Sequence, residues 1–132
     1  MAKDNLFGVG LDIGTMNIVS ARRTHAGVET RRVRDAFLSL DSSAKKMLRL
    51  AGVAYVERGE ELVILGDPAL EMANMFGREA RRPLSAGVVS SNDVDAMEVL
   101  GLLVRNVLGE PKCPGEHCYF SIPAAPVDVP GS

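Results

Sequence analysis

Hydrophobic and polar positions alternate along the first forty residues in a pattern typical of β-strands. The pattern predicts three strands, at Phe7–Leu11, Asn17–Arg23 and Val28–Leu38. Two short polar segments, Asp12–Met16 and His25–Gly27, separate these strands, and the glycine of the first segment can adopt a positive φ angle. Because tight turns join strands that pair with each other, we expect an antiparallel meander.

After residue 40 the pattern changes to short helices and short strands. It predicts a helix at Ser42–Leu50, strands at Val53–Val56 and Glu61–Leu65, and a second helix from Asp67 to Gly77. Asp41 or Ser42 is the expected N-cap of the first helix, since both side chains can accept a backbone hydrogen bond. Asp67 is the expected cap of the second helix, because a proline follows it at the first helical position.

The strongest helical pattern begins near Asn92 and Asp93 and ends at Gly109. Its apolar positions recur every three or four residues, at Met97, Leu100, Leu103, Val104, Val107 and Leu108. After a loop, Cys118–Pro123 is predicted to be one more buried strand, stopped by its proline. Strands followed by helices, with a last strand that returns to the sheet, predict an α/β fold.

Length and charge narrow the class of protein. The chain has 132 residues, a length typical of one domain. Its formal net charge is −2, so it lacks the excess of basic residues that nucleic-acid-binding proteins carry. No apolar run approaches the roughly 20 residues that span a bilayer. The first seven residues lack the apolar stretch and cleavage site of a secretory signal, so we expect a cytoplasmic protein and no nucleic-acid partner.

Three potential metal ligands lie close together near the end of the chain. Cys113, His117 and Cys118 are one ligand short of a closed zinc site, and no second cysteine pair completes it. A disulfide between the two cysteines is not expected in a reducing compartment. We therefore expect a loop with two reduced thiols.

The segment Gly10–Asn17 carries the candidate chemistry. A buried strand ends in Asp12, and Gly14, Thr15 and Asn17 follow in the turn. Successive backbone N–H groups in such a turn can bind an anion, and a carboxylate can hold the water ligands of Mg²⁺. The alternative is a plain β-hairpin with a polar turn, which fits any isolated D-x-G-T.

Five segments, in order, resemble the actin-like ATPase superfamily, which includes MreB-type bacterial actins and the nucleotide domains of heat-shock chaperones. Gly10–Asn17 resembles its first phosphate motif. The later segments are Ile64–Met72, Arg82–Val89, the helix from Asp93 onward and Phe120–Ala124. The resemblance implies a ribonuclease H-like subdomain, with a three-stranded antiparallel meander extended by a further strand and flanked by helices.

The resemblance also implies a ligand, which is ATP with Mg²⁺ bound between two domains of a filament-forming protein. It assigns Asp12 to Mg²⁺ through water, and Gly14, Thr15, Met16 and Asn17 to the phosphates. Met16 stands where the family more often has a small or polar residue, so its contact is absent or made by the backbone. No catalytic residue is assigned within these segments.

The resemblance further implies that the chain is part of a longer protein, because family members run to more than twice its length. Residues 1–39 and 66–132 correspond to subdomain IA, and residues 40–65 to a short insertion in the place of subdomain IB. Alone, the chain is expected to bind ATP weakly and to self-associate or bind a complementary chain. Three alternatives stay open: a chaperone or assembly-factor ATPase, a catalytically silent adaptor, and contact with a membrane surface through the basic helix at Ser42–Leu50.

Overall fold

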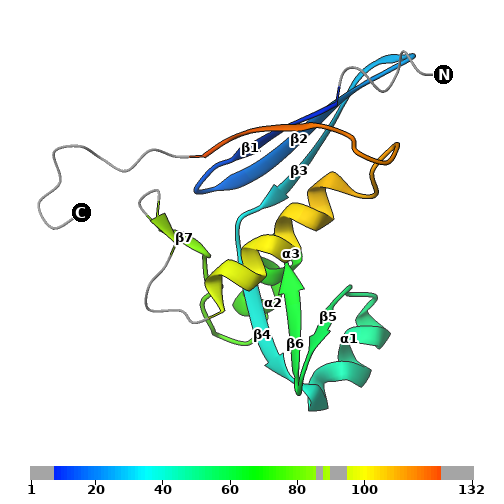
Figure 1. Cartoon of the computed structure of the whole chain (residues 1–132). Coiled ribbons are helices and arrows are strands. Elements are labelled where there is room, and N and C mark those ends of the chain that lie inside the picture. Colours follow the sequence, from blue (N-terminus) through cyan, green and yellow to red (C-terminus); the bar gives the residue numbers. More distant parts are fainter. Residues whose placement is uncertain (1–7, 86–87, 90–94, 123–132) are drawn as a thin grey trace, which may run out of the picture.

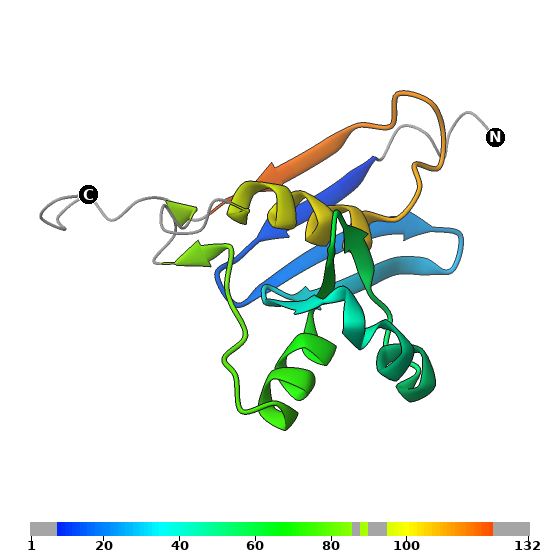
Figure 2. The same cartoon turned by 90° about the horizontal axis from the view of Figure 1, so that it is seen from below.

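The computed structural model describes residues 8–85, 88–89 and 95–122, and this part of the chain is a mixed α/β structure (Figure 1). These ranges form a four-stranded sheet, a three-stranded sheet, a two-stranded ribbon and three α-helices. Helix α3 (Ala96–Leu108) lies between the two larger sheets, while α1 (Lys45–Ala51) and α2 (Asp67–Met75) pack against the three-stranded sheet (Figure 2). The predicted α/β class is confirmed.

The four-stranded sheet has the order β3-β2-β1-β9. Strands β1 (Val9–Ile13), β2 (Asn17–Thr24) and β3 (Gly27–Arg34) form the predicted antiparallel meander, and β9 (Cys118–Ser121) lies parallel to β1. The prediction that the last strand is buried was wrong, since all four residues of β9 are exposed. Strand β9 is an edge strand, and α3 makes its main sheet contacts with β2 and β3 instead.

The three-stranded sheet has the order β4-β6-β5, and its strands are β4 (Phe37–Asp41), β5 (Val56–Arg58) and β6 (Glu61–Leu65). A single strand over Val28–Leu38 was therefore a wrong prediction, because the chain leaves the first sheet after Arg34 and enters the second at Phe37. The Ala36 carbonyl accepts a hydrogen bond from Gly66 N–H at 2.9 Å, which holds this crossing against the start of α2.

The hairpin of the second sheet begins at Val56 and not at Val53. Gly52 ends α1 with a φ of 72°, and Val53 N–H donates to the Leu48 carbonyl at 2.9 Å. The backbone at Val53 thus completes the helix end and is not free to pair in the sheet.

The helix caps agree with the sequence in part. Asp41 accepts a hydrogen bond from Ser43 N–H at 3.3 Å and caps the 3₁₀ turn Ser42–Ala44 that precedes α1, as predicted. The N-cap of α2 is Gly66, with a φ of 78°, and Asp67 is its first helical residue, so Asp67 was wrongly predicted as the cap.

Gly109 ends α3 by donating to the Arg105 carbonyl at 3.0 Å, as predicted. The ribbon consists of β7 (Leu84–Ser85) and β8 (Val88–Val89). The predicted helix start at Asn92 and Asp93, and the predicted strand limits Phe7 and Pro123, lie outside the described residues.

Alternate residues of β6 belong to two different hydrophobic cores. Leu62 and Ile64 pack with α1, α2 and one face of β4, whereas Val63 packs with α3 and the four-stranded sheet. Since side chains of a strand point alternately to opposite faces, the second sheet is covered on both sides. Helix α3 covers the inner face of the meander, and the outer face of the meander carries the half-buried Val19 and the exposed Asp12.

Two polar contacts fix the end of α3 on the meander. Ser20 Oγ donates to the Val107 carbonyl at 2.8 Å, and Arg22 donates to the Leu108 carbonyl. Arg22 also pairs with Glu116 at 2.9 Å, and this hydrogen bond lowers the pKa of the Glu116 carboxyl. A cation at a helix C-terminus is favourable. The contacts with Glu116 hold the loop that leads into β9.

Candidate functional site

The turn between β1 and β2 closes through one backbone hydrogen bond. Gly14 N–H donates to the Asn17 carbonyl at 2.9 Å. A Cβ atom at Gly14 would lie 2.8 Å from that carbonyl oxygen, which is closer than a side chain tolerates. Gly14 is not one of the glycines with a positive φ angle, so the expected reason for this glycine was wrong. The turn needs glycine for space and not for φ.

Asp12 lies at the end of β1, with its carboxylate exposed on the outer face of the meander. Ser121 Oγ donates to Asp12 Oδ1 at 2.9 Å, and the parallel register places the two residues side by side. Oδ2 accepts no hydrogen bond from the described residues. The sequence alone does not assign Ser121 to the site, although Ser121 lies in the segment Phe120–Ala124 that resembles the actin-like family. The parallel pairing of β9 with β1 is the missing step.

The three residues that follow Gly14 differ in what they offer. Thr15 and Asn17 are half-buried, and the Oδ1 atom of Asn17 is buried without a hydrogen-bond partner among the described residues. Met16 is 51% exposed, and its carbonyl accepts a hydrogen bond from Asp35 N–H at 2.9 Å. A contact from Met16 to a ligand would therefore have to use its N–H group or its side chain.

Asp35 is a second residue that sequence reasoning missed. It is completely buried behind the turn, and neither carboxylate oxygen accepts a hydrogen bond from a described residue. Burial raises the pKa of the Asp35 carboxyl to about 6, and the positive charge of Arg82 partly opposes the rise. The only signal in the sequence is an aspartate immediately before the apolar run that forms β4.

The turn offers a bare cation only one carboxylate, that of Asp12, among the described residues. No group of three or more His, Cys, Asp or Glu side chains that could bind a metal occurs within residues 8–85, 88–89 and 95–122. Asp12 contributes one carboxylate, which suits Mg²⁺ only where water and ligand phosphates complete its octahedral shell. The donor types at the turn therefore fit Mg²⁺ bound together with a phosphate.

Cys113 and Cys118 are unbonded thiols, the first half-buried and the second exposed.

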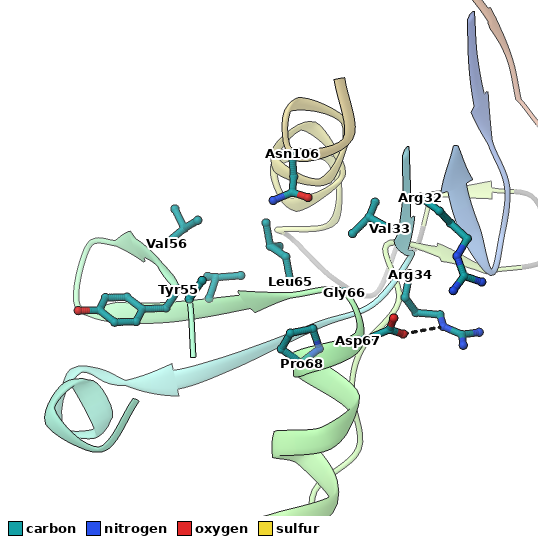
Figure 3. Close-up of a pocket in the computed structure, with 12 residues that line it drawn as sticks. Arg32, Val33, Arg34, Tyr55, Val56, Leu65, Gly66, Asp67, Pro68 and Asn106 are labelled. Carbon is teal, nitrogen blue, oxygen red and sulfur yellow. Dashed lines mark hydrogen bonds and ion pairs between the residues drawn. The ribbon is translucent and has the colours of Figure 1, made fainter. Parts of the chain in front are cut away.

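A half-open cavity lined by described residues lies away from this turn. It has a volume of about 300 Å³ and lies between β3, the β5–β6 hairpin and the start of α2, and no residue of Asp12–Asn17 lines it (Figure 3). A shallower depression on the outer face of the meander borders Asp12 and Ser121. We place the candidate site at the turn because of its carboxylate and polar side chains, and not because of the depth of the surface there.

Comparison with known proteins identifies a family. A family model described as Volactin matches residues 7–132. The chain belongs to the Volactin family. The matched range contains the β1–β2 turn and β9, so the whole candidate site lies within the Volactin match. No curated protein and no solved structure matches the chain.

Proposed function

We propose that this volactin is an actin-like, ATP-binding protein in which the β1–β2 turn contacts the phosphates of ATP·Mg²⁺. The observation that carries the proposal is the exposed carboxylate of Asp12 near the end of β1, two residues before Gly14, whose Cα lies close to the backbone of the turn. The sheet order β3-β2-β1-β9 adds support. An antiparallel meander extended by a parallel strand is the arrangement expected of a ribonuclease H-like subdomain.

Each residue of the turn has a role in this proposal. Asp12 holds a water ligand of Mg²⁺ through Oδ2, since Ser121 occupies Oδ1. Thr15 and Asn17 contact phosphate oxygens, Met16 contributes its backbone N–H, and Gly14, whose own N–H donates to the Asn17 carbonyl, shapes the turn that presents them. Such a site acts by positioning and by electrostatic stabilisation of the transferred phosphoryl group.

The domain assignment follows from the same proposal. Residues 1–39 and 66–132 form subdomain IA, and residues 40–65, with α1 and the β5–β6 hairpin, form the IB-like insertion. The first sheet and α3 then support the turn, while the second sheet is a smaller unit that shares the core around Val63.

We further propose that the protein assembles into filaments. Exposed apolar side chains on or beside the edge strand β9 support this, namely Tyr119, Phe120 and Ile122. Edge strands and apolar patches of this kind promote association between chains. Sedimentation of the complete gene product with ATP would separate a filament-forming protein from a chaperone-type ATPase, which cycles without forming a pellet.

Among the described helices, none is long and apolar enough to cross a bilayer.

The assignment of the turn is tested by substitution in the complete gene product. Asp12→Ala is expected to lower Mg²⁺-dependent ATP hydrolysis at least a hundredfold, because the water ligand of Mg²⁺ would lose the carboxylate that holds it. Glu110→Ala, an exposed acid beyond the end of α3, is the matched control and should hydrolyse ATP at the wild-type rate. Equal turnover for wild type and Asp12→Ala would refute the assignment, and calorimetric binding of ATP without turnover would identify a silent adaptor.

A further inference from the structure

The cavity between β3, the β5–β6 hairpin and the start of α2 has an apolar lining and a basic rim. Its apolar lining residues include Val33, Val63 and Leu65. At its rim are the last two arginines of β3, Arg32 and Arg34, whose guanidinium groups point to the opposite side of the strand from Val33 (Figure 3). Its volume of about 300 Å³ lies at the lower end of the range for ligand pockets, roughly 300–1,000 Å³. One or two apolar side chains of a partner could enter a space of this size.

Two strand edges border this cavity. Strand β3 is at the edge of the four-stranded sheet, and β5 is at the edge of the three-stranded sheet. Among the described residues, β3 pairs with no strand other than β2. On its other side the Arg34 carbonyl accepts a hydrogen bond from Ala36 N–H at 2.8 Å, so the backbone groups open to a further strand are those that precede this carbonyl. An exposed sheet edge of this kind can accept an extended peptide as an additional strand.

The charge at the rim indicates what kind of peptide would fit. Arg32 is exposed, and its guanidinium forms no ion pair with a described residue. The guanidinium of Arg34 contacts Asp67 at 3.3 Å, in a pair whose carboxylate side chain is 56% exposed. A carboxylate ligand can therefore form a bidentate pair with Arg32. It can also replace Asp67 as the partner of Arg34, because an ion pair with a solvent-exposed carboxylate is weak.

We propose that this cleft binds an extended acidic segment of a partner protein, which pairs with the free edge of β3 and inserts an apolar side chain into the cavity. The alternation of the strand sets the pattern of the ligand. Arg32 and Arg34 lie on one face of β3 and Val33 lies on the other, so the bound segment reads acidic, apolar, acidic. The proposal is independent of the nucleotide site, since no residue of the β1–β2 turn lines the cavity.

A peptide of defined pattern provides the direct test. The probe is an end-blocked, fluorescein-labelled heptapeptide of alternating Glu and Leu, and the readout is fluorescence anisotropy. Wild type is expected to bind this probe, and Arg32→Glu is expected to raise Kd at least tenfold through the lost charge-assisted contact. Lys46→Glu makes the same change of charge on an exposed lysine of α1 that does not line the cavity, and should leave Kd within about twofold.

Two further reagents separate the parts of the proposal. Asn106→Trp places a large side chain of α3 in the cavity without altering β3 (Figure 3). It is expected to weaken binding of the probe as strongly as Arg32→Glu does. The same peptide with alternate backbone nitrogens methylated cannot donate to a strand edge, and should not bind.

Three results would overturn the proposal. Equal affinity for wild type and Arg32→Glu would remove the charge argument, and undiminished binding of the methylated peptide would exclude strand pairing. Absence of binding to wild type would mean that the arginines only protect this edge from aggregation, as charges on edge strands commonly do.

Discussion

Asp35→Asn is expected to stabilise the protein at neutral pH, because the native carboxylate is buried without hydrogen-bond donors. Asp35 is 0% exposed, and neither of its oxygens has a hydrogen-bond partner among the described residues. Burial raises the pKa of this carboxyl from 3.8 to about 6, although Arg82 opposes part of the rise. This difference corresponds to about 3 kcal/mol against the ionised form in the folded protein.

The sign of the pH dependence follows from which state loses its proton first. The unfolded chain ionises Asp35 near 3.8, whereas the folded chain holds that proton until about 6. Stability therefore falls as the pH rises through this interval, and the full penalty is present above the folded pKa. Because asparagine does not ionise, the difference in unfolding free energy between Asp35→Asn and wild type should grow by about 2.5 kcal/mol from about pH 4 to about pH 7.

Urea unfolding, followed by circular dichroism across this pH range, measures the difference directly. Carboxyls with lowered pKa, such as Glu116, make both proteins more stable as the pH rises, and they cancel in the comparison. Asp41→Asn is a control of opposite sign, since the hydrogen bonds from Ser43 lower the pKa of Asp41 and the native side chain stabilises above its titration. A difference between Asp35→Asn and wild type that stays constant with pH would refute the reasoning.

Two other substitutions test the turn and the anchoring of α3. Gly14→Ala places a Cβ 2.8 Å from the Asn17 carbonyl oxygen and should cost about 1–3 kcal/mol in urea unfolding. Gly101→Ala, at an open position of α3, should stabilise by about 0.5–1 kcal/mol, and equal effects of the two would contradict the steric argument. Arg22→Met leaves Glu116 almost buried without its partner and should cost about 3 kcal/mol at neutral pH. Because the lowered pKa of Glu116 depends on Arg22, this variant should also lose less stability on acidification than wild type, and parallel pH profiles would argue against that role.

Local patterns predicted the meander and the third helix because their residues interact with near neighbours in the sequence. The turn at Gly14 joins strands only three residues apart, and the apolar stripe of α3 repeats at helical spacing. These features depend on tight turns and on periodicity, which a single sequence displays directly. The position of Asp12 at the end of a strand was predictable for the same reason.

Features that depend on distant contacts were not predictable in this way. The break between β3 and β4 occurs because Ala36 and Phe37 bind backbone at Gly66 and Arg81, far along the chain. The burial of Asp35 and the contact between Ser121 and Asp12 likewise require knowledge of which elements come together. The exposure of β9 follows from the position of α3, which the composition of the strand does not reveal.

The pairing of β1 with two strands of very different sequence position has a consequence for synthesis. Strand β2 follows β1 almost at once, but the contact between Asp12 and Ser121 joins residues 109 positions apart. At roughly 5–20 residues per second, a ribosome leaves the second edge of β1 without its partner for about 5–20 s. The acid of the proposed nucleotide site is thus made 109 residues before the serine that supplies its hydrogen-bond donor.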